Sequence, residues 1–180
     1  MYKITNMKKS KFIYLLILPL IIFSCDTFDK FDHFGVGNTF EESFEVKVPE
    51  GSITTFEGSA SFDASDDSTL NDNIDAITQF EVTRISMKIT KVASTKIMAE
   101  GEVSITSDGV PVGDPVSMNL DLSSDEEVLL AITPATFEAI KKAYLDKQKI
   151  KITASGSVSD TPIDVEFTIY MSIEATIQNN

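Results

Sequence analysis

Side chains suited to covalent chemistry are scarce in this chain of 180 residues, which contains one cysteine, one histidine and no tryptophan. Cys25 and His33 both lie in the stretch CDTFDKFDHFGVG, residues 25–37. Nucleophilic catalysis needs an imidazole inside a preorganised site, and a zinc ion needs more ligands than one histidine. Because His33 precedes the region in which strand patterns begin, we expect no catalytic or metal-binding role for it. The single cysteine excludes a disulfide within the chain.

Carboxylates are far more abundant, with 28 Asp and Glu residues. Hard oxygen ligands from an acidic loop suit Ca²⁺. One segment holds five candidate ligands: Asp63, Asp66, Asp67, Asp72 and Asp75. It lacks the glycine and the final glutamate that an EF-hand loop requires, so a solvated loop between two strands is the alternative. Paired carboxylates also perform general acid–base chemistry, as in glycosidases, when a cleft holds them at a set separation.

The residues before Cys25 are organised like an export signal. Three lysines within residues 8–11 precede an unbroken apolar run over residues 12–23, and the small Ser24 follows. The run has 12 residues and contains a proline, whereas a membrane-spanning helix needs about 20 apolar residues. We therefore predict a cleaved signal peptide over residues 1–24 instead of a permanent membrane span.

A cysteine at this place resembles the bacterial lipoprotein signal family, whose lipobox ends in a small residue followed by cysteine. Here the lipobox is Ile-Phe-Ser-Cys, residues 22–25, with Phe23 where a small residue is usual. The resemblance implies that the Cys25 thiol carries a diacylglyceryl group and its amine a further acyl chain. Each buried CH₂ contributes about 0.8 kcal/mol, so two or three chains anchor a protein firmly. A buried free thiol is the alternative, and Met1 and Met7 are alternative starts of the signal.

The tripeptide Asp-x-Phe occurs three times in succession over residues 26–34. We predict that residues 25–39 form a flexible tether behind the lipidated cysteine. Acidic residues directly after that cysteine resemble the surface-export signals of lipoproteins from the Bacteroidota. The resemblance implies an outer-membrane location, on the periplasmic or the cell-surface face. The alternative is a solvated tether whose Phe side chains dock on the folded domain or on lipid.

Charge restricts the partners. The chain carries a formal net charge of −13, and residues 1–24 contribute four of its 15 basic residues and no acidic one. The remaining chain thus has 11 basic and 28 acidic residues, a net charge of −17. Such a surface repels phosphate backbones and anionic headgroups, so we expect no nucleic-acid binding and no membrane attachment through charge.

From residue 40 onward, apolar and polar residues alternate, which is typical of half-buried strands. The alternating segments are residues 44–48, 56–62, 80–89, 97–105, 116–122, 150–158 and 163–177. Turn residues at 49–51 predict a hairpin between the first two segments, and a change of phase at 83–84 predicts a bulge. The last segment would span about 50 Å as a straight strand, so we expect it to bend and serve two neighbours in succession.

Two helices are expected among the strands. Thr133 precedes a proline, which places a capping residue before a favoured first helical residue. Phe137, Ile140 and Tyr144 then give one apolar face to a helix of about three turns. Leucine and isoleucine at helical spacing in the acidic segment predict a second, short helix capped by Ser68.

Seven or eight antiparallel strands with one or two helices favour a two-layer, immunoglobulin-like β-sandwich, formed by one domain over residues 40–180. A barrel closing on itself is the alternative. The segment from the Thr133 helix through KIKITASGSVSDTPIDVEFTIYMSIEATI resembles the closing part of LEA-2/WHy-type β-sandwich domains. There a small helix precedes two long strands that carry Gly-x-Val and end on Ala-x-Ile. The resemblance implies the same sandwich.

These observations predict a lipid-anchored envelope protein with a binding or structural role and no enzymatic activity. Its partners would be the membrane, through Cys25, and another envelope protein. Two alternatives stay open. One is a calcium-dependent binding or adhesive module centred on residues 63–75, and the other is a carboxylate-based hydrolase, which requires converging acids with a raised carboxyl pKa.

Overall fold

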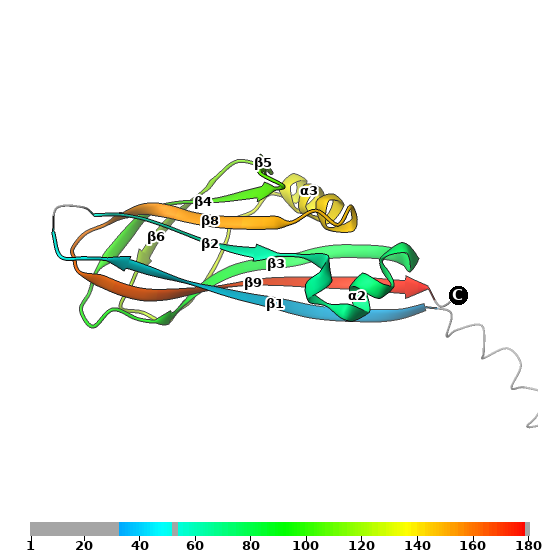
Figure 1. Cartoon of the computed structure of the whole chain (residues 1–180), viewed down its shortest axis with the longest axis horizontal. Coiled ribbons are helices and arrows are strands. Elements are labelled where there is room, and N and C mark those ends of the chain that lie inside the picture. The colour runs from blue at the N-terminus through cyan, green and yellow to red at the C-terminus, as the bar shows by residue number, and fades with distance from the viewer. Residues whose placement is uncertain (1–32, 52–53, 179–180) are drawn as a thin grey trace, which may run out of the picture.

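The alternating segments form two antiparallel β-sheets that pack face to face (Figure 1). The structure, a computed structural model, describes residues 33–51 and 54–178. Sheet A has the order β1 (His33–Val48), β9 (Ile163–Gln178), β3 (Ile77–Lys91) and β7 (Glu127–Leu129). Sheet B has the order β2 (Thr55–Phe62), β8 (Ile150–Val158), β4 (Met98–Ser107) and β5 (Val110–Pro111), and β6 (Val116–Asp121) also pairs with β4. The predicted antiparallel two-layer β-sandwich with short helices is confirmed.

The centre of sheet A is β9, which pairs with β1 on one side and with β3 on the other along most of its length. Its side chains alternate strictly, and the odd-numbered residues from Ile163 to Ile177 are all buried. The prediction that this strand pairs with two neighbours in succession is therefore wrong, because β9 pairs with β1 and β3 along the same residues. The predicted bulge is confirmed, since the register between β3 and β9 shifts between Val82 and Arg84.

Two other predictions about β1 need correction. β1 and β2 do not form a hairpin across residues 49–51, because β1 pairs with β9 and β2 pairs with β8. The turn thus carries the chain from one sheet to the other. β1 also begins at His33, seven residues before the domain start predicted at residue 40, and residues 33–39 pair with 172–178. Asn38 interrupts the apolar phase of Phe34, Val36 and Phe40 there, and residues 35 and 37 in the outer phase are glycines, so the pattern gave no strand signal.

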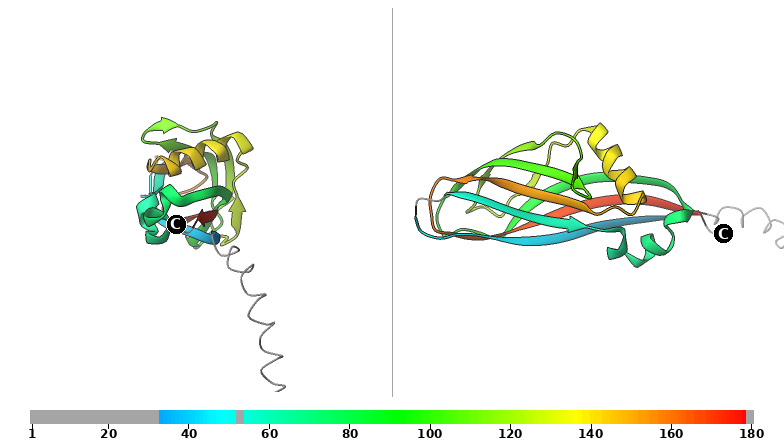
Figure 2. Two further views of the ribbon diagram at one scale, coloured as in Figure 1. Left: turned by 90° about the vertical axis from the view of Figure 1, so that its right-hand side faces the viewer. Right: turned by 45° about the horizontal axis from the view of Figure 1, so that its top comes forward.

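The two ends of the sandwich differ. The terminal end holds the start of β1 and the end of β9, because Phe34 pairs with Ile177. The loop end holds the end of β1, the start of β2 and the connection over residues 158–163. At the terminal end β1, β3 and β9 run past the strands of sheet B, and α2 (Ser68–Asp72) and α3 (Pro134–Leu145) lie beside this overhang (Figures 1 and 2).

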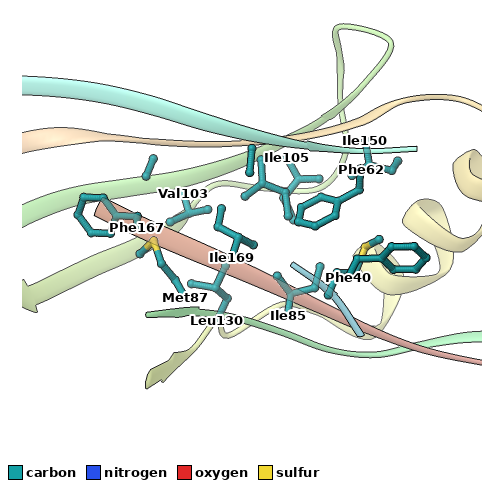
Figure 3. Packing of buried hydrophobic residues seen from close by; sticks show 14 of the residues in the cluster. Phe40, Phe62, Ile85, Met87, Val103, Ile105, Leu130, Ile150, Phe167 and Ile169 are labelled. Carbon is teal, nitrogen blue, oxygen red and sulfur yellow. The ribbon is translucent and has the colours of Figure 1, made fainter. Parts of the chain in front are cut away.

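Towards the loop end the sheets pack directly on each other. Phe167 of β9 stacks between Phe44 and Phe56, with ring centroids 5.4 and 6.3 Å away. Gly58 of β2 leaves the space that the Phe44 ring occupies, because a Cβ there would overlap that ring. Figure 3 shows Phe167 and its neighbour Met87 facing sheet B.

The helix predicted after Thr133 is confirmed as α3, with the Thr133 side chain accepting a hydrogen bond from the Thr136 backbone N–H. α3 buries Ile140 and Tyr144, which fill the core where sheet B has ended. The short helix α2 also exists, but its N-cap is Asp67, one residue before the predicted Ser68. No helix among the described residues is long and apolar enough to cross a membrane.

Candidate functional site

Cys25 and the whole predicted lipobox lie outside the described residues. The first described residue, His33, is the first residue of β1 at the terminal end. Eight residue steps separate Cys25 from His33, and a fully extended chain of that length spans at most about 27 Å. A lipid on Cys25 would therefore lie within that distance of the terminal end.

The acidic segment lies at the terminal end as well, where three of its five aspartates cap short helices. Asp63 caps the 3₁₀ turn η2 (Ala64–Asp66), and its Oδ1 accepts hydrogen bonds from the backbone N–H of Ser65 at 2.9 Å and the Ser65 hydroxyl at 2.8 Å. Asp66 completes this capping box by accepting from the Asp63 N–H at 2.7 Å. These hydrogen bonds from Ser65 hold the pKa of Asp63 below its ordinary value.

Asp67 connects the acidic segment to sheet A. One of its carboxylate oxygens accepts from the backbone N–H of Leu70 at 3.0 Å, and the other accepts from the side-chain amide of Asn38 in β1. Asp72 and Asp75 lie on the exposed surface. Within residues 33–51 and 54–178, no group of three or more His, Cys, Asp or Glu side chains is arranged to hold a metal ion. Several of the oxygens expected to bind Ca²⁺ are instead acceptors for this protein's own donors.

Beneath this segment lies a buried phenol, for which the sequence pattern predicts only a place on the apolar face of a helix. Tyr144 of α3 is fully buried, and its ring stacks on Phe80 at 5.1 Å and lies 5.9 Å from Phe40. Its hydroxyl is buried without a hydrogen-bond partner among the described residues. Burial raises the pKa of Tyr144, and the negative charge of Asp67 adds to the rise. The phenol is thus held neutral and does not supply a base or nucleophile at neutral pH.

Other carboxylates are held as anions. Asp164 of β9 pairs with Lys91 at 2.7 Å, and this interaction lowers the pKa of Asp164. Hydrogen bonds from Ser123 lower the pKa of Asp121 in the same way. A general acid in a hydrolase needs the opposite shift, because it must carry a proton at neutral pH. These two carboxylates therefore stabilise the local structure and carry negative charge on the surface, and they are poorly suited to act as general acids.

Hydroxyl groups on sheet A also bond to one another across the strands. Thr168 of β9 is buried, and its hydroxyl lies 2.8 Å from that of Ser43 and 3.1 Å from that of Thr90. The Thr90 hydroxyl donates to a carboxylate oxygen of Glu166 at 2.7 Å. The outer face of the sheet therefore satisfies its own polar groups at the level of these residues, which gives a stable polar surface and no reactive hydroxyl.

Ser86 is the most deeply buried serine in the described chain, and it too has a structural partner. Its hydroxyl donates to Glu127 of β7, which also pairs with Arg84 at 2.7 Å. These contacts fasten the three-residue strand β7 to β3. A serine nucleophile needs an adjacent base that can take its proton, and a carboxylate already paired with arginine is poorly suited to that task.

No protein-family model and no curated protein sequence matches this chain. Solved structures with a similar arrangement of strands include the decameric BFDV capsid protein, at 8% identity and a TM-score of 0.44, covering 79% of this chain and 99% of that protein. Mud crab tombus-like virus gives 9% identity, a TM-score of 0.41, and coverage of 99% and 87%. Turnip yellow mosaic virus gives 10% identity, a TM-score of 0.35, and coverage of 81% and 96%. At such low values the similarity says nothing about function.

Proposed function

We propose that this protein is a lipid-anchored lipoprotein of a bacterial outer membrane, and that its β-sandwich acts by binding another envelope protein instead of by catalysis. The observation that carries the proposal is the position of the chain's first described strand. β1 starts eight residues after Cys25 and enters the sandwich at the terminal end. A lipid there would hold the sandwich by one end and leave both sheet faces and the loop end accessible.

The surface chemistry supports a binding role. Both sheets expose polar side chains on their outer faces, and the carboxylates with shifted pKa values are held as anions by hydrogen bonds or ion pairs. Anions on a stable β-scaffold provide electrostatic complementarity to a basic partner. The hydrolase alternative gains no support from these shifts, because they move away from the protonated state that an acid catalyst needs.

The calcium alternative also gains no support from the geometry of the acidic segment. Asp63, Asp66 and Asp67 already accept hydrogen bonds from the backbone or from Asn38. A ligand that binds the native state alone must raise the melting temperature as its concentration rises. We therefore expect millimolar Ca²⁺ and millimolar Mg²⁺ to leave the melting temperature of the full chain equally unchanged. A rise with Ca²⁺ alone would revive the calcium-dependent module.

The anchor is tested by growing cells with an alkyne-labelled fatty acid and comparing the wild-type chain with Cys25→Ala. We expect label on the wild-type protein and none on the variant, which should leave the membrane fraction while keeping its fold. Label on both proteins, or on neither, contradicts lipidation at Cys25.

The binding role is tested by cross-linking in intact cells, purification of both forms and mass spectrometry of the partners. We expect the same envelope protein to be recovered repeatedly with the wild-type chain and to be depleted with Cys25→Ala, which no longer resides at the membrane. Recovery of no reproducible partner at several cross-linker lengths contradicts the binding role and leaves the anchor result standing by itself.

A further inference from the structure

A hollow of about 450 Å³ indents the outer face of sheet A at the terminal end. It extends over β1, β9 and β3, which lie side by side there (Figure 1). Two features of its lining stand out: a floor of two glycines in β1 and two glutamates on the neighbouring strands. The residues of its lining that face outward are Gly35, Gly37, Gln79, Glu81, Glu174 and Thr176.

The glycines create the hollow. Gly37 pairs with Glu174 of β9, and Gly35 pairs with Thr176, so a side chain at either position would stand on the outer face beside these residues. A Cβ on Gly37 would meet nothing within 4 Å, and a Cβ on Gly35 would meet one backbone oxygen at 4.0 Å. Neither close packing nor a positive φ requires glycine at these positions. Their effect on the structure is the open space above them.

The two glutamates of the hollow lie on neighbouring strands and face each other. Glu81 and Glu174 are directly opposite in the register of β3 and β9, so their carboxylates share the outer face. Like charges at directly opposite positions destabilise a sheet. Both side chains are exposed, and no ion pair to either occurs among the described residues.

The loop end of the same face is arranged differently. There Asp164 pairs with Lys91 at 2.7 Å and Glu45 pairs with Lys47 at 2.6 Å. Among the described residues, lysines therefore compensate two carboxylates near the loop end of this face, whereas no cation pairs with Glu81 or Glu174 at the hollow. A cation from outside the molecule would remove the repulsion between Glu81 and Glu174.

We propose that this hollow is the docking point for a lysine or arginine side chain of a protein partner. The alkyl stem of such a side chain would lie over Gly35 and Gly37, and its charged head would reach Glu81 and Glu174. Gln79 and Thr176, at the border of the hollow, supply neutral oxygen acceptors for the remaining N–H donors. Complementary charge favours this occupant, because the chain carries a net charge of −13 and attracts basic segments. The inference rests on the proposed binding role and is independent of the lipid anchor.

The direct test is nuclear magnetic resonance on the ¹⁵N-labelled full chain in nonionic detergent micelles. The probe is Nα-acetyl-lysine methylamide, whose side-chain amine is free and charged. The control is Nα-acetyl-norleucine methylamide, which has the same alkyl stem without the amine. We expect saturable shifts of the Gly35 and Gly37 amide signals with the lysine probe, weakened by added salt, and none with the norleucine probe. Equal shifts with both probes, or shifts spread over the whole acidic surface, contradict the proposal.

Two variants separate a shaped site from general negative charge. Gly37→Val fills the hollow without removing any charge, and we expect it to abolish the saturable shift of Gly35. Glu81→Gln/Glu174→Gln should weaken lysine binding about fivefold, as expected for the loss of two exposed charge interactions. The matched control is Glu57→Gln/Glu102→Gln, which removes two exposed charges from the outer face of sheet B and should leave binding unchanged. Equal weakening by both double variants, or full binding by Gly37→Val, contradicts the site.

The same variants distinguish this inference from the proposed function. If the cross-linked envelope partner is lost with Gly37→Val but retained with Glu57→Gln/Glu102→Gln, the hollow is where that partner docks. If the partner is retained with Gly37→Val, the binding role stands and the hollow is not its docking point. If no partner is recovered with any form, the binding role fails, and the resonance titration alone decides whether the hollow binds a cationic side chain.

Discussion

The two ends of this sandwich solve the same packing problem with different elements. Towards the loop end, sheet packs on sheet, and Phe167 lies between Phe44 and Phe56. At the terminal end sheet A extends beyond sheet B (Figure 2). There the helix α3 supplies the buried Tyr144, whose ring stacks on Phe80 of β3. The core is therefore covered by sheet B towards the loop end and by α3 at the terminal end, and β9 extends through both parts.

The comparison teaches that one continuous strand can belong to two packing environments without any change in its own pattern. Ile163 to Ile177 alternate without a break, although the partner layer changes from a sheet to a helix along the way. Apolar burial is non-directional, so either layer satisfies the strand. The difference between the ends appears in the residues that fill the space opposite β9.

The largest predicted effects come from truncating the aromatic residue at the centre of each environment. Phe167→Ala and Tyr144→Ala should each lower the free energy of unfolding by about 3–5 kcal/mol, because both leave a cavity in the core. Since β9 passes through both environments, we expect each variant to reduce hydrogen-exchange protection along all of β9. Urea titration followed by circular dichroism gives the loss of stability, and exchange with mass spectrometry gives its distribution.

A local response would break this comparison. If Tyr144→Ala exposes only residues 171–178 of β9 while residues 163–169 keep their protection, the terminal end unfolds by itself and the core is not one cooperative unit. Tyr144→Phe, which keeps the ring, is the control that separates the cavity from the loss of the hydroxyl.

Glycines sharpen the comparison between inner and outer positions. Gly101 of β4 lies opposite Gly156 of β8, and a Cβ on either one would overlap backbone atoms of the other strand. Gly101→Ala should therefore destabilise the domain by about 1–3 kcal/mol, the usual range for overpacking. Gly37→Ala, at the open hollow, should cost nothing and can stabilise by a few tenths of a kcal/mol through the unfolded state. The stability of both variants is measured by thermal and urea unfolding. If Gly37→Ala loses as much stability as Gly101→Ala, the space above Gly37 is not free.

Much of the fold could be predicted from local patterns. The alternation of residues 163–177 predicts β9, the phase change at 83–84 predicts the bulge, and Thr133 before a proline predicts the start of α3. Each of these signals depends on neighbouring residues alone, through the two-residue period of strands or the hydrogen bonds of a helix cap. A local signal of this kind survives in any tertiary structure that keeps the element.

Strand pairing and the candidate sites are harder to predict from the sequence, because they depend on residues far apart in it. The register of Phe34 with Ile177 joins the two ends of the domain, and residues 49–51 have turn chemistry whether or not they close a hairpin. The acidic segment was recognised, but the use of Asp67 as a helix cap and as a partner of Asn38 follows from how the segment lies against β1. The hollow was missed, because glycine in a strand signals open space only when the neighbouring strands are known.

Helix caps at the terminal end provide a smaller test. Thr133→Ala removes the hydrogen bond to the Thr136 N–H and should cost about 1 kcal/mol, whereas Thr133→Ser should retain most of the stability. Asp67→Ala removes a cap and the bond to Asn38 together, so we expect it to cost more than Thr133→Ala although α2 has only five residues. The free energies come from urea titrations of the three variants. A smaller cost for Asp67→Ala would show that the acidic segment contributes little to holding β1.

The smallest effect at neutral pH is expected for Tyr144→Phe, which removes the unpartnered buried hydroxyl and keeps the ring contacts with Phe80 and Phe40. Deleting such a group should leave stability unchanged or raise it by up to about 1 kcal/mol. At alkaline pH the raised pKa also predicts the direction in which stability changes. Below the ordinary phenol pKa of 10.0 both states keep the proton, but above it the unfolded chain ionises while burial keeps Tyr144 neutral. The wild-type protein should therefore lose stability relative to Tyr144→Phe as the pH rises from about 9 to about 11.

Parallel curves of unfolding free energy against pH would contradict the raised pKa of Tyr144. A Tyr144→Phe variant that is clearly less stable at neutral pH would carry a different message, because it would mean that the hydroxyl makes a favourable hydrogen bond, to a buried water for example. The terminal end would then be held by a polar contact beneath Asp67, in addition to its aromatic packing. In that case the difference between the two ends would extend to their chemistry, with an apolar aromatic stack near the loop end and a hydrated phenol under the acidic segment at the other.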